Sequence, residues 1–259
     1  MGTRNSPMGN AESLLAIGLT FLLAGFVKGV IGLGLPTVSL ALLTVTVGLK
    51  TGMVLLIVPS FITNVWQGLS GGALGAILKR LWPFFAAICV GTWFGVKGLA
   101  TYDPTLLTAL LGVLLCIYAA LNLRRPWKPD IADKENWLGP LAGAVTGGLT
   151  GLTGSFVVPG VMYLQALAMP RDMLIQTMGV AFTVCTVALA VGLNDQRMIS
   201  QELGTLSAAG VVPAIIGMVI GQRVRGRLSE AMFLKVFFTA LAVLGVYISV
   251  LSLIAYGET

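Results

Sequence analysis

The sequence has few charged residues and no histidine. Charged side chains make up 10% of its 259 residues, against about 25% in a soluble domain. Without histidine, the chain lacks the commonest general base and the commonest metal ligand. Its three cysteines lie in apolar stretches and indicate neither a disulfide framework nor a metal cluster: Cys89, Cys116 and Cys185. We therefore expect no enzymatic activity, no cofactor and no bound metal.

Acidic residues are also missing from the middle of the apolar segments. Aspartate and glutamate lie at segment ends or in loops, at Glu12, Asp103, Asp172, Asp195, Glu202 and Glu230. A buried carboxylate relay is the usual device for coupling transport to protons. The sequence therefore shows no such relay.

What the sequence has in excess is apolar residues and glycine. Hydrophobic residues make up 56% of the chain, and the mean hydropathy is +0.93. Glycine occupies 33 positions, roughly twice its average usage of about 7%, and membrane helices tolerate it well. This composition indicates closely packed helices embedded in a lipid bilayer.

The apolar residues fall into ten segments. Crossing a hydrocarbon core of about 30 Å takes about 20 helical residues. Seven segments approach or reach that length, over 13–31, 51–70, 81–100, 105–122, 172–193, 204–223 and 231–255. Three are shorter and interrupted by glycine, threonine or proline, over 35–48, 138–153 and 155–168. We expect these three to be half-helices or re-entrant segments.

The two halves of the chain resemble each other. The stretch 23–29 aligns with 141–147, with five identities in seven positions, and near an offset of 126 Gly91 and Gly95 fall on Gly217 and Gly221. Five segments per half would place the second half upside down in the membrane. We predict an all-α polytopic membrane protein with two inverted repeats of about five segments each, the first pair of each repeat short, broken or re-entrant. The repeats span 13–122 and 138–255, and 123–137 is a cytoplasmic linker.

The glycine pairs at 91/95 and 217/221 follow a small-xxx-small spacing. Such spacing usually marks close helix contact, within one chain or in a dimer. A homodimer is therefore one possible assembly.

The basic residues predict an orientation. If ten segments alternate across the membrane, eleven lysines and arginines lie on one side and four on the other. The positive-inside rule then places the eleven in the cytoplasm and both termini outside the cell membrane. Short pairs that enter and return on one side fit the charges equally well. This placement explains the net charge of +6 without a nucleic-acid partner, in an inner-membrane, multi-pass protein.

Lys28 is the one basic residue deep within a segment. An ionised lysine at mid-bilayer costs at least about 2.5–3.5 kcal/mol on insertion scales. We interpret Lys28 as a cation that faces the protein interior and meets an anionic substrate. The alternatives are snorkelling to the interface and pairing with a carbonyl.

Two glycine-rich runs interrupt the short segments in corresponding places. The first follows Lys28 and contains Gly32, Gly34 and Pro36. The second contains Thr150, Thr153, Gly154 and Ser155. Broken helices in both halves of a transporter indicate its binding site, since freed N–H groups and positive helix ends attract anions. The alternative is two tight turns that only pack hairpins together.

A third polar group lies inside the segment 51–70. Thr63, Asn64 and Gln67 share one helical face, and Trp66 lies between them in the sequence. Because unsatisfied amides are costly in hydrocarbon, this face must point inward. It either binds substrate oxygens or joins helices together. Thr183 lies in the corresponding segment of the second half, where a hydrogen bond back to its own helix is the expected role.

The first run, GFVKGVIGLGLPTV, resembles the signature of the sulfite exporter TauE/SafE permease family, and the second, GLTGLTGSFVVP, is similar to it. The stretch PSFITNVWQ at 59–67 also resembles a pattern of this family. The resemblance implies transport of sulfite, sulfonates or related sulfur-containing anions.

Three hypotheses follow from these patterns. The first is a carrier that works by alternating access on a small organosulfur anion, with Lys28, the two glycine-rich runs and the Asn64 face as its site. The second is a passive anion channel that uses Lys28 for selectivity. The third is an assembly subunit that transports nothing. The expected partners are a small anion and the lipid bilayer.

Overall fold

The computed structural model describes residues 11–124, 131 and 134–257. These residues form helices and connecting turns, and none of them lies in a strand. The twelve helices are α1 (Ala11–Ile31), α2 (Leu35–Val47), α3 (Leu49–Leu55), α4 (Ile57–Leu69), α5 (Leu74–Thr101), α6 (Pro104–Leu123), α7 (Glu135–Thr153), α8 (Gly160–Ala166), α9 (Arg171–Asp195), α10 (Gln201–Ala209), α11 (Val211–Arg225) and α12 (Glu230–Gly257). The prediction of an all-α polytopic membrane protein is confirmed.

Among the described residues, six helical stretches are long and apolar enough to cross a membrane, with α10 and α11 together forming one of them. The bent pair of α3 and α4 makes a seventh when it is taken as one span. Helices α2 and α8 have 13 and 7 residues, too few to cross a core that needs about 20. The chain therefore combines full spans with short helices buried against protein.

Each of the ten predicted segments contains at least one helix. Segment 51–70, predicted as continuous, is instead broken between α3 and α4, whose axes differ by 45°. Segment 204–223 is divided at Gly210 between α10 and α11. Helix α1 has 21 residues, as the long segment 13–31 predicts, whereas α7 has 19 residues and is longer than the short segment 138–153. Most of the predicted linker 123–137 lies outside the described residues.

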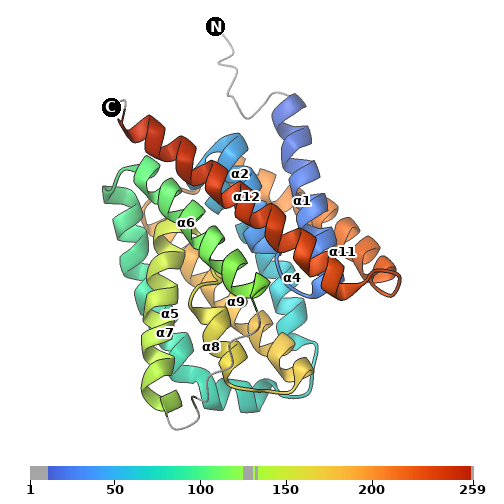
Figure 1. Ribbon diagram of the computed structural model, residues 1–259. Helices are drawn as coiled ribbons and strands as arrows, with labels where there is room; N and C mark the ends of the chain where they lie inside the picture. Colours follow the sequence, from blue (N-terminus) through green and yellow to red (C-terminus); the bar gives the residue numbers. More distant parts are fainter. Residues whose placement is uncertain (1–10, 125–130, 132–133, 258–259) are drawn as a thin grey trace, which may run out of the picture.

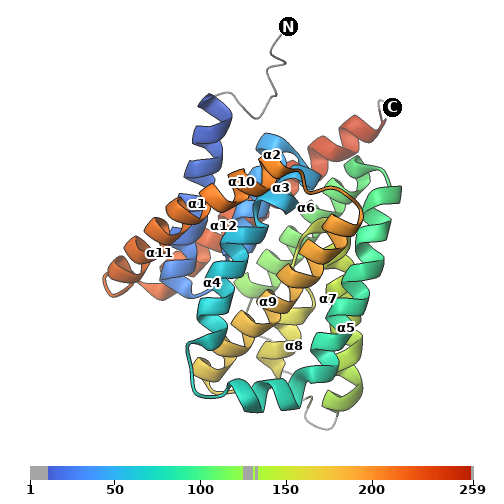
Figure 2. The same ribbon diagram turned by 180° about the vertical axis from the view of Figure 1, so that it is seen from behind.

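The helices pack in four main pairs. Helix α1 packs on α11, α5 on α7, α6 on α12, and α4 on α9. Figures 1 and 2 show the α1–α11 pair and the α5–α7 pair at opposite sides of the molecule, with α4 and α9 between them. Helix α1 begins and α12 ends at the same end of the molecule (Figure 1). The pairing places α4 and α9 between the two outer pairs, each with one buried and one exposed face.

Glycines bring two of these pairs into backbone contact. A Cβ placed on Gly29 of α1 would lie 3.0 Å from Gly221 Cα of α11. In the α5–α7 pair, a Cβ on Gly95 would lie 2.9 Å from Gly151 Cα. Such contacts are tighter than side chains normally allow, so these faces need glycine. The predicted close contact of the glycine pairs 91/95 and 217/221 is confirmed within the chain.

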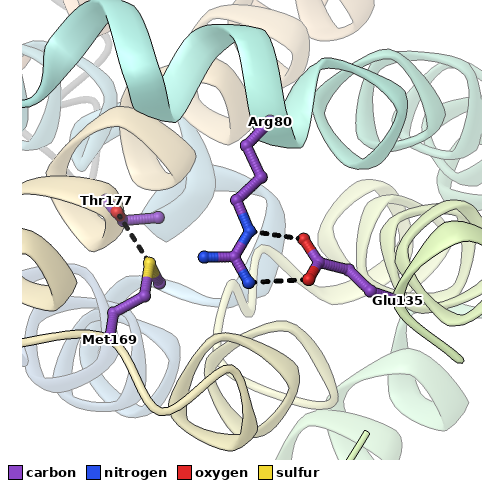
Figure 3. Close-up of polar contacts among 4 residues, drawn as sticks. All are labelled: Arg80, Glu135, Met169 and Thr177. Atoms are coloured by element: carbon purple, nitrogen blue, oxygen red, sulfur yellow. Dashed lines mark hydrogen bonds and ion pairs between the residues drawn. The ribbon is translucent and has the colours of Figure 1, made fainter. Parts of the chain in front are cut away.

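An ion pair joins the α5–α7 pair near one end. Arg80 of α5 donates two hydrogen bonds to the carboxylate of Glu135, at 2.7 Å from Nε and 2.6 Å from the terminal nitrogen (Figure 3). Figure 3 also shows a separate contact, in which the Thr177 hydroxyl of α9 lies 3.7 Å from the sulfur of Met169. The fork geometry suits a guanidinium and a carboxylate, and the pair links the two helices near where they begin.

Candidate functional site

Lys28 lies in the last turn of α1, and its side chain is buried, with 4% exposed. Its ammonium group donates hydrogen bonds to the Thr63 hydroxyl, at 3.2 Å, and to Asn64 Oδ1. Among the described residues, no carboxylate bonds to it. The interior position of Lys28 agrees with the structure and snorkelling does not. The bond to the side-chain carbonyl of Asn64 matches the alternative of pairing with a carbonyl, and the contact with an anion stays a prediction.

The partners of Lys28 come from the buried face of α4. Ser60, Thr63, Asn64 and Gln67 are all buried, as their spacing of three and four residues on one helical face predicts. Thr63 accepts from Lys28 while its own proton is donated to Pro59 O, at 2.8 Å. The face therefore presents polar groups to the end of α1.

Two donors of this face have no partner within the described chain. They are the hydroxyl of Ser60 and the Nδ2 amide of Asn64. The two residues lie four positions apart, one above the other on α4. Leaving such groups unpaired costs about 1–3 kcal/mol each. Unpaired buried donors beside a buried ammonium suit a ligand that accepts hydrogen bonds.

The first glycine-rich run breaks the helix directly after Lys28. Helix α1 ends at Ile31 and α2 begins at Leu35. Gly32 and Gly34 have φ angles of +79° and +105°, a region that side-chain-bearing residues rarely adopt. Pro36 lies in the first turn of α2, where its missing N–H is no loss. The predicted break is confirmed, and Lys28 lies one turn before it.

The second run ends α7 and precedes α8, with Gly154 at a φ of +74°. The Thr150 hydroxyl donates to Ser155 O at 3.1 Å, and the Thr153 oxygen accepts from Ser155 N at 3.3 Å. These bonds satisfy the break internally, while the buried Ser155 hydroxyl has no partner within the described residues. A Cβ on Gly154 would meet Leu40 and Met53. The structure thus confirms the break but gives it no hydrogen bond to Lys28.

The remaining predicted residues do not join the Lys28 cluster. Trp66 is 69% exposed and lies on the outer surface of α4. The Gln67 amide donates to Ile175 O of α9 at 2.8 Å, which matches the alternative role of joining helices. Thr183 donates back to Gly179 O of its own helix at 2.7 Å, as expected.

Three residues that contribute here were not among the predicted site residues. Ser60 adds a free hydroxyl next to Asn64. Gln176 of α9 bonds to the end of α4. Ser207 of α10 accepts from Val58 N at 3.1 Å and donates to Leu55 O at 2.7 Å, which bridges the break between α3 and α4. A polar residue inside an apolar segment is the signal that marks Ser60 and Gln176.

The cluster of Lys28, Ser60, Thr63 and Asn64 offers positive charge and hydrogen-bond donors. The described residues hold no group of three side chains that could bind a metal ion. With an ammonium, an amide and a hydroxyl in a buried setting, the cluster suits a small oxygen-bearing anion.

Comparison with known proteins gives one match. The chain matches the sulfite exporter TauE/SafE family over residues 17–248, which is nearly its whole length. No curated protein and no solved structure matches the chain significantly.

Proposed function

The chain belongs to the sulfite exporter TauE/SafE family, and from this premise we propose that it carries sulfite, a sulfonate or a related small organosulfur anion by alternating access. Membership in this family and the apolar spans make it a multi-pass membrane transporter. The substrate and the mechanism are the proposed part.

One observation carries the choice of an anion. The Lys28 ammonium is buried and bonded to neutral oxygens, and no carboxylate among the described residues balances its charge. A buried cation without a counter-charge is costly. An anion bound between Lys28, Asn64 Nδ2 and the Ser60 hydroxyl would neutralise that charge and satisfy both unpaired donors.

The helix pairing supports two inverted repeats. In the two proposed repeats, α1 corresponds to α7 and α5 corresponds to α11. The packing of α1 on α11 is then equivalent to the packing of α7 on α5. The α6–α12 and α4–α9 pairs each join corresponding helices. Two repeats related by a pseudo-twofold axis generate this pattern of equivalent helix pairs.

The proposed orientation follows the charges. Lys79 and Arg80 lie in the second turn of α5, soon after the turn at 70–73, and Arg171 begins α9. The positive-inside rule places this end of the molecule in the cytoplasm. Helix α1 begins and α12 ends at the opposite end of the molecule from that turn (Figure 1), which fits two extracytoplasmic ends in an inner membrane.

The buried position of the cluster requires movement. Lys28 and Asn64 are 4% and 0% exposed, so an ion cannot reach them until the surrounding helices part. A site that is closed at rest and opens toward either face in turn is what alternating access demands.

Thermal unfolding of the purified protein tests the substrate class. We expect sulfite, or one of taurine and sulfoacetate, to raise the unfolding temperature of the native chain, as any ligand of the folded state does, and to have no effect on Lys28→Ala. The matched control is Lys97→Ala, because Lys97 is exposed on α5 and lies over the Trp93 ring. If no oxyanion, sulfate included, raises the unfolding temperature, the proposed substrate class is wrong.

Proteoliposomes separate the carrier from the two other hypotheses. A carrier shows counterflow of labelled substrate against an unlabelled gradient, whereas a channel shows none. An assembly subunit shows no transport, and Lys28→Met then changes nothing in this assay. We expect saturable counterflow that Lys28→Met abolishes.

A further inference from the structure

Two glutamines join the ends of α4 and α9 by reciprocal bonds. The Gln67 amide of α4 donates to Ile175 O of α9 at 2.8 Å, and the Gln176 amide of α9 donates to Gly68 O of α4 at 3.0 Å. Gln176 also accepts a hydrogen bond from Ala73 N at 3.0 Å. Gln176 and Gln67 are only 1% and 9% exposed. We call Gln67 and Gln176 the glutamine clamp.

Beside the clamp, α4 and α9 cross with their backbones in contact. A Cβ placed on Gly179 would lie 2.5 Å from Gly68 N, and one on Gly68 would lie 3.1 Å from Val180 N. Side chains larger than hydrogen therefore do not fit between the helices at this crossing. The clamp and the glycine crossing together leave no space between the two helix ends.

The clamp lies directly beyond the Lys28 cluster. Gln67 follows Thr63 and Asn64 by one helical turn on the same buried face of α4. After the clamp, the chain turns through 70–73 into α5, whose second turn carries Lys79 and Arg80. The clamp thus lies between the cluster and that side of the molecule.

The opposite end of α4 has a bend. The axes of α3 and α4 differ by 45°, and Leu56 separates the two helices. Ser207 holds this bend through its bonds to Val58 N and Leu55 O. Thirteen residues of α4 therefore lie between a bend at one end and the clamp at the other.

We propose that the glutamine clamp is the gate on the α4–α5 turn side of the transporter, and that it opens when α4 turns about its bend and separates from α9. This proposal rests on the proposed transport function. Opening breaks three hydrogen bonds that involve neutral groups, and it exposes Asn64 and Lys28 to that side alone. By the charge distribution this side is the cytoplasm.

The gate is tested by the accessibility of the cluster to a thiol reagent. Cys89, Cys116 and Cys185 are replaced by alanine, and Ser60→Cys, one turn from Asn64, serves as the reporter. A membrane-impermeant methanethiosulfonate that carries a sulfonate group is added to right-side-out and inside-out vesicles. The variants are Gln67→Leu, and Gln67→Leu combined with Gln176→Leu. Gln222→Leu is the matched control, because Gln222 is exposed on α11.

We expect the double variant to raise the labelling rate of Ser60→Cys about tenfold from the cytoplasmic side and to leave the rate from the other side unchanged. Gln67→Leu alone removes one of the three bonds and raises the rate less, which keeps the test valid if the double variant does not fold. Gln222→Leu leaves both rates unchanged. Equal labelling from both sides, or no increase from either, overturns the gate.

The labelling needs no transported substrate. A chain that none of the organosulfur anions stabilises can still show one-sided labelling, so a failure of the substrate class is distinguishable from a failure of the gate. Conversely, anion stabilisation with an unchanged labelling rate retains the substrate class and discards the gate.

Discussion

The ammonium group of Lys28 in α1 donates a hydrogen bond to Oδ1 of Asn64 in α4, and Nδ2 of the same amide has no partner among the described residues. The pair therefore joins two helices while it leaves donors available. Its properties can be tested by exchanging one atom of the amide for another.

Asn64→Asp should remove anion binding while it stabilises the resting protein. A carboxylate beside Lys28 forms an internal ion pair, which occupies the charge that a substrate would otherwise neutralise. Hydrogen bonds to charged groups contribute about 1.5–3 kcal/mol, so we expect a higher unfolding temperature and no further rise on addition of sulfite. Thermal unfolding with and without sulfite measures both effects. Asn194→Asp, at an exposed position, should retain the response to sulfite; retention of the response in Asn64→Asp would contradict the assigned site.

Glycine substitutions in α1 should separate by the contact each one makes. A Cβ on Gly25 meets the Ala214 backbone of α11, whereas a Cβ on Gly18 meets nothing within 4 Å. Gly25→Ala should cost about 1–3 kcal/mol of stability, because the helices must move apart. Gly18→Ala should be neutral or stabilise by up to about 1 kcal/mol, through helix propensity. Thermal unfolding of both variants decides the matter, and equal effects would argue against the α1–α11 contact.

Ser207→Ala should loosen the bend between α3 and α4. The change removes two hydrogen bonds and leaves the N–H of Val58 without its partner, a loss of about 1–3 kcal/mol. Thr205→Val is the control, because the exposed Thr205 hydroxyl bonds only to its own helix, at Gln201 O and Glu202 O. Hydrogen exchange of residues 55–60 should rise in Ser207→Ala and not in Thr205→Val. Unchanged exchange at 55–60 would show that Ser207 does not hold the bend.

The Arg80–Glu135 pair should contribute little energy in spite of its geometry. The Arg80 side chain is 41% exposed, so water and salt screen the interaction. A double-mutant cycle with Arg80→Gln and Glu135→Gln should give a coupling energy of about 0.5–1 kcal/mol that falls as salt is added. A coupling several times larger, or one insensitive to salt, would mean that the pair is buried in the bilayer-embedded protein.

Several features of the fold could be predicted because they depend on local sequence. Gly32, Gly34 and Pro36 end one helix and start another through their own backbone preferences. Lys28 faces inward because exposure to hydrocarbon is costly. Such constraints act on single residues or short runs, and the structure follows them.

Other features depend on contacts between distant residues. Pro59 marks the bend in segment 51–70 locally, because it has no N–H to donate to Leu55 O. That carbonyl instead accepts from Ser207, about 150 residues away in the chain. The clamp likewise needs Gln176 from the other half. Pro59 could therefore have predicted the bend, but a single segment carries no sign of a partner that far away.

The candidate site was predicted in part, and the error at Trp66 has a geometric cause. Residues 64, 66 and 67 are close in sequence, but successive residues of a helix are about 100° apart, with 3.6 residues per turn. Asn64 and Gln67 therefore point inward while Trp66 points toward lipid. Of the two inward amides, Asn64 reaches Lys28, and Gln67 is bonded to α9.

A protonated Lys28 without a counter-charge in the empty site has an electrical consequence. One elementary charge that crosses the full membrane potential changes the energy by about 2.3 kcal/mol per 100 mV. Under the proposed mechanism, the empty site carries a positive charge through part of that field each time its access changes sides. A bound monovalent anion cancels this charge. The unloaded step is then the one that responds to voltage, and the membrane potential sets how fast the empty carrier returns.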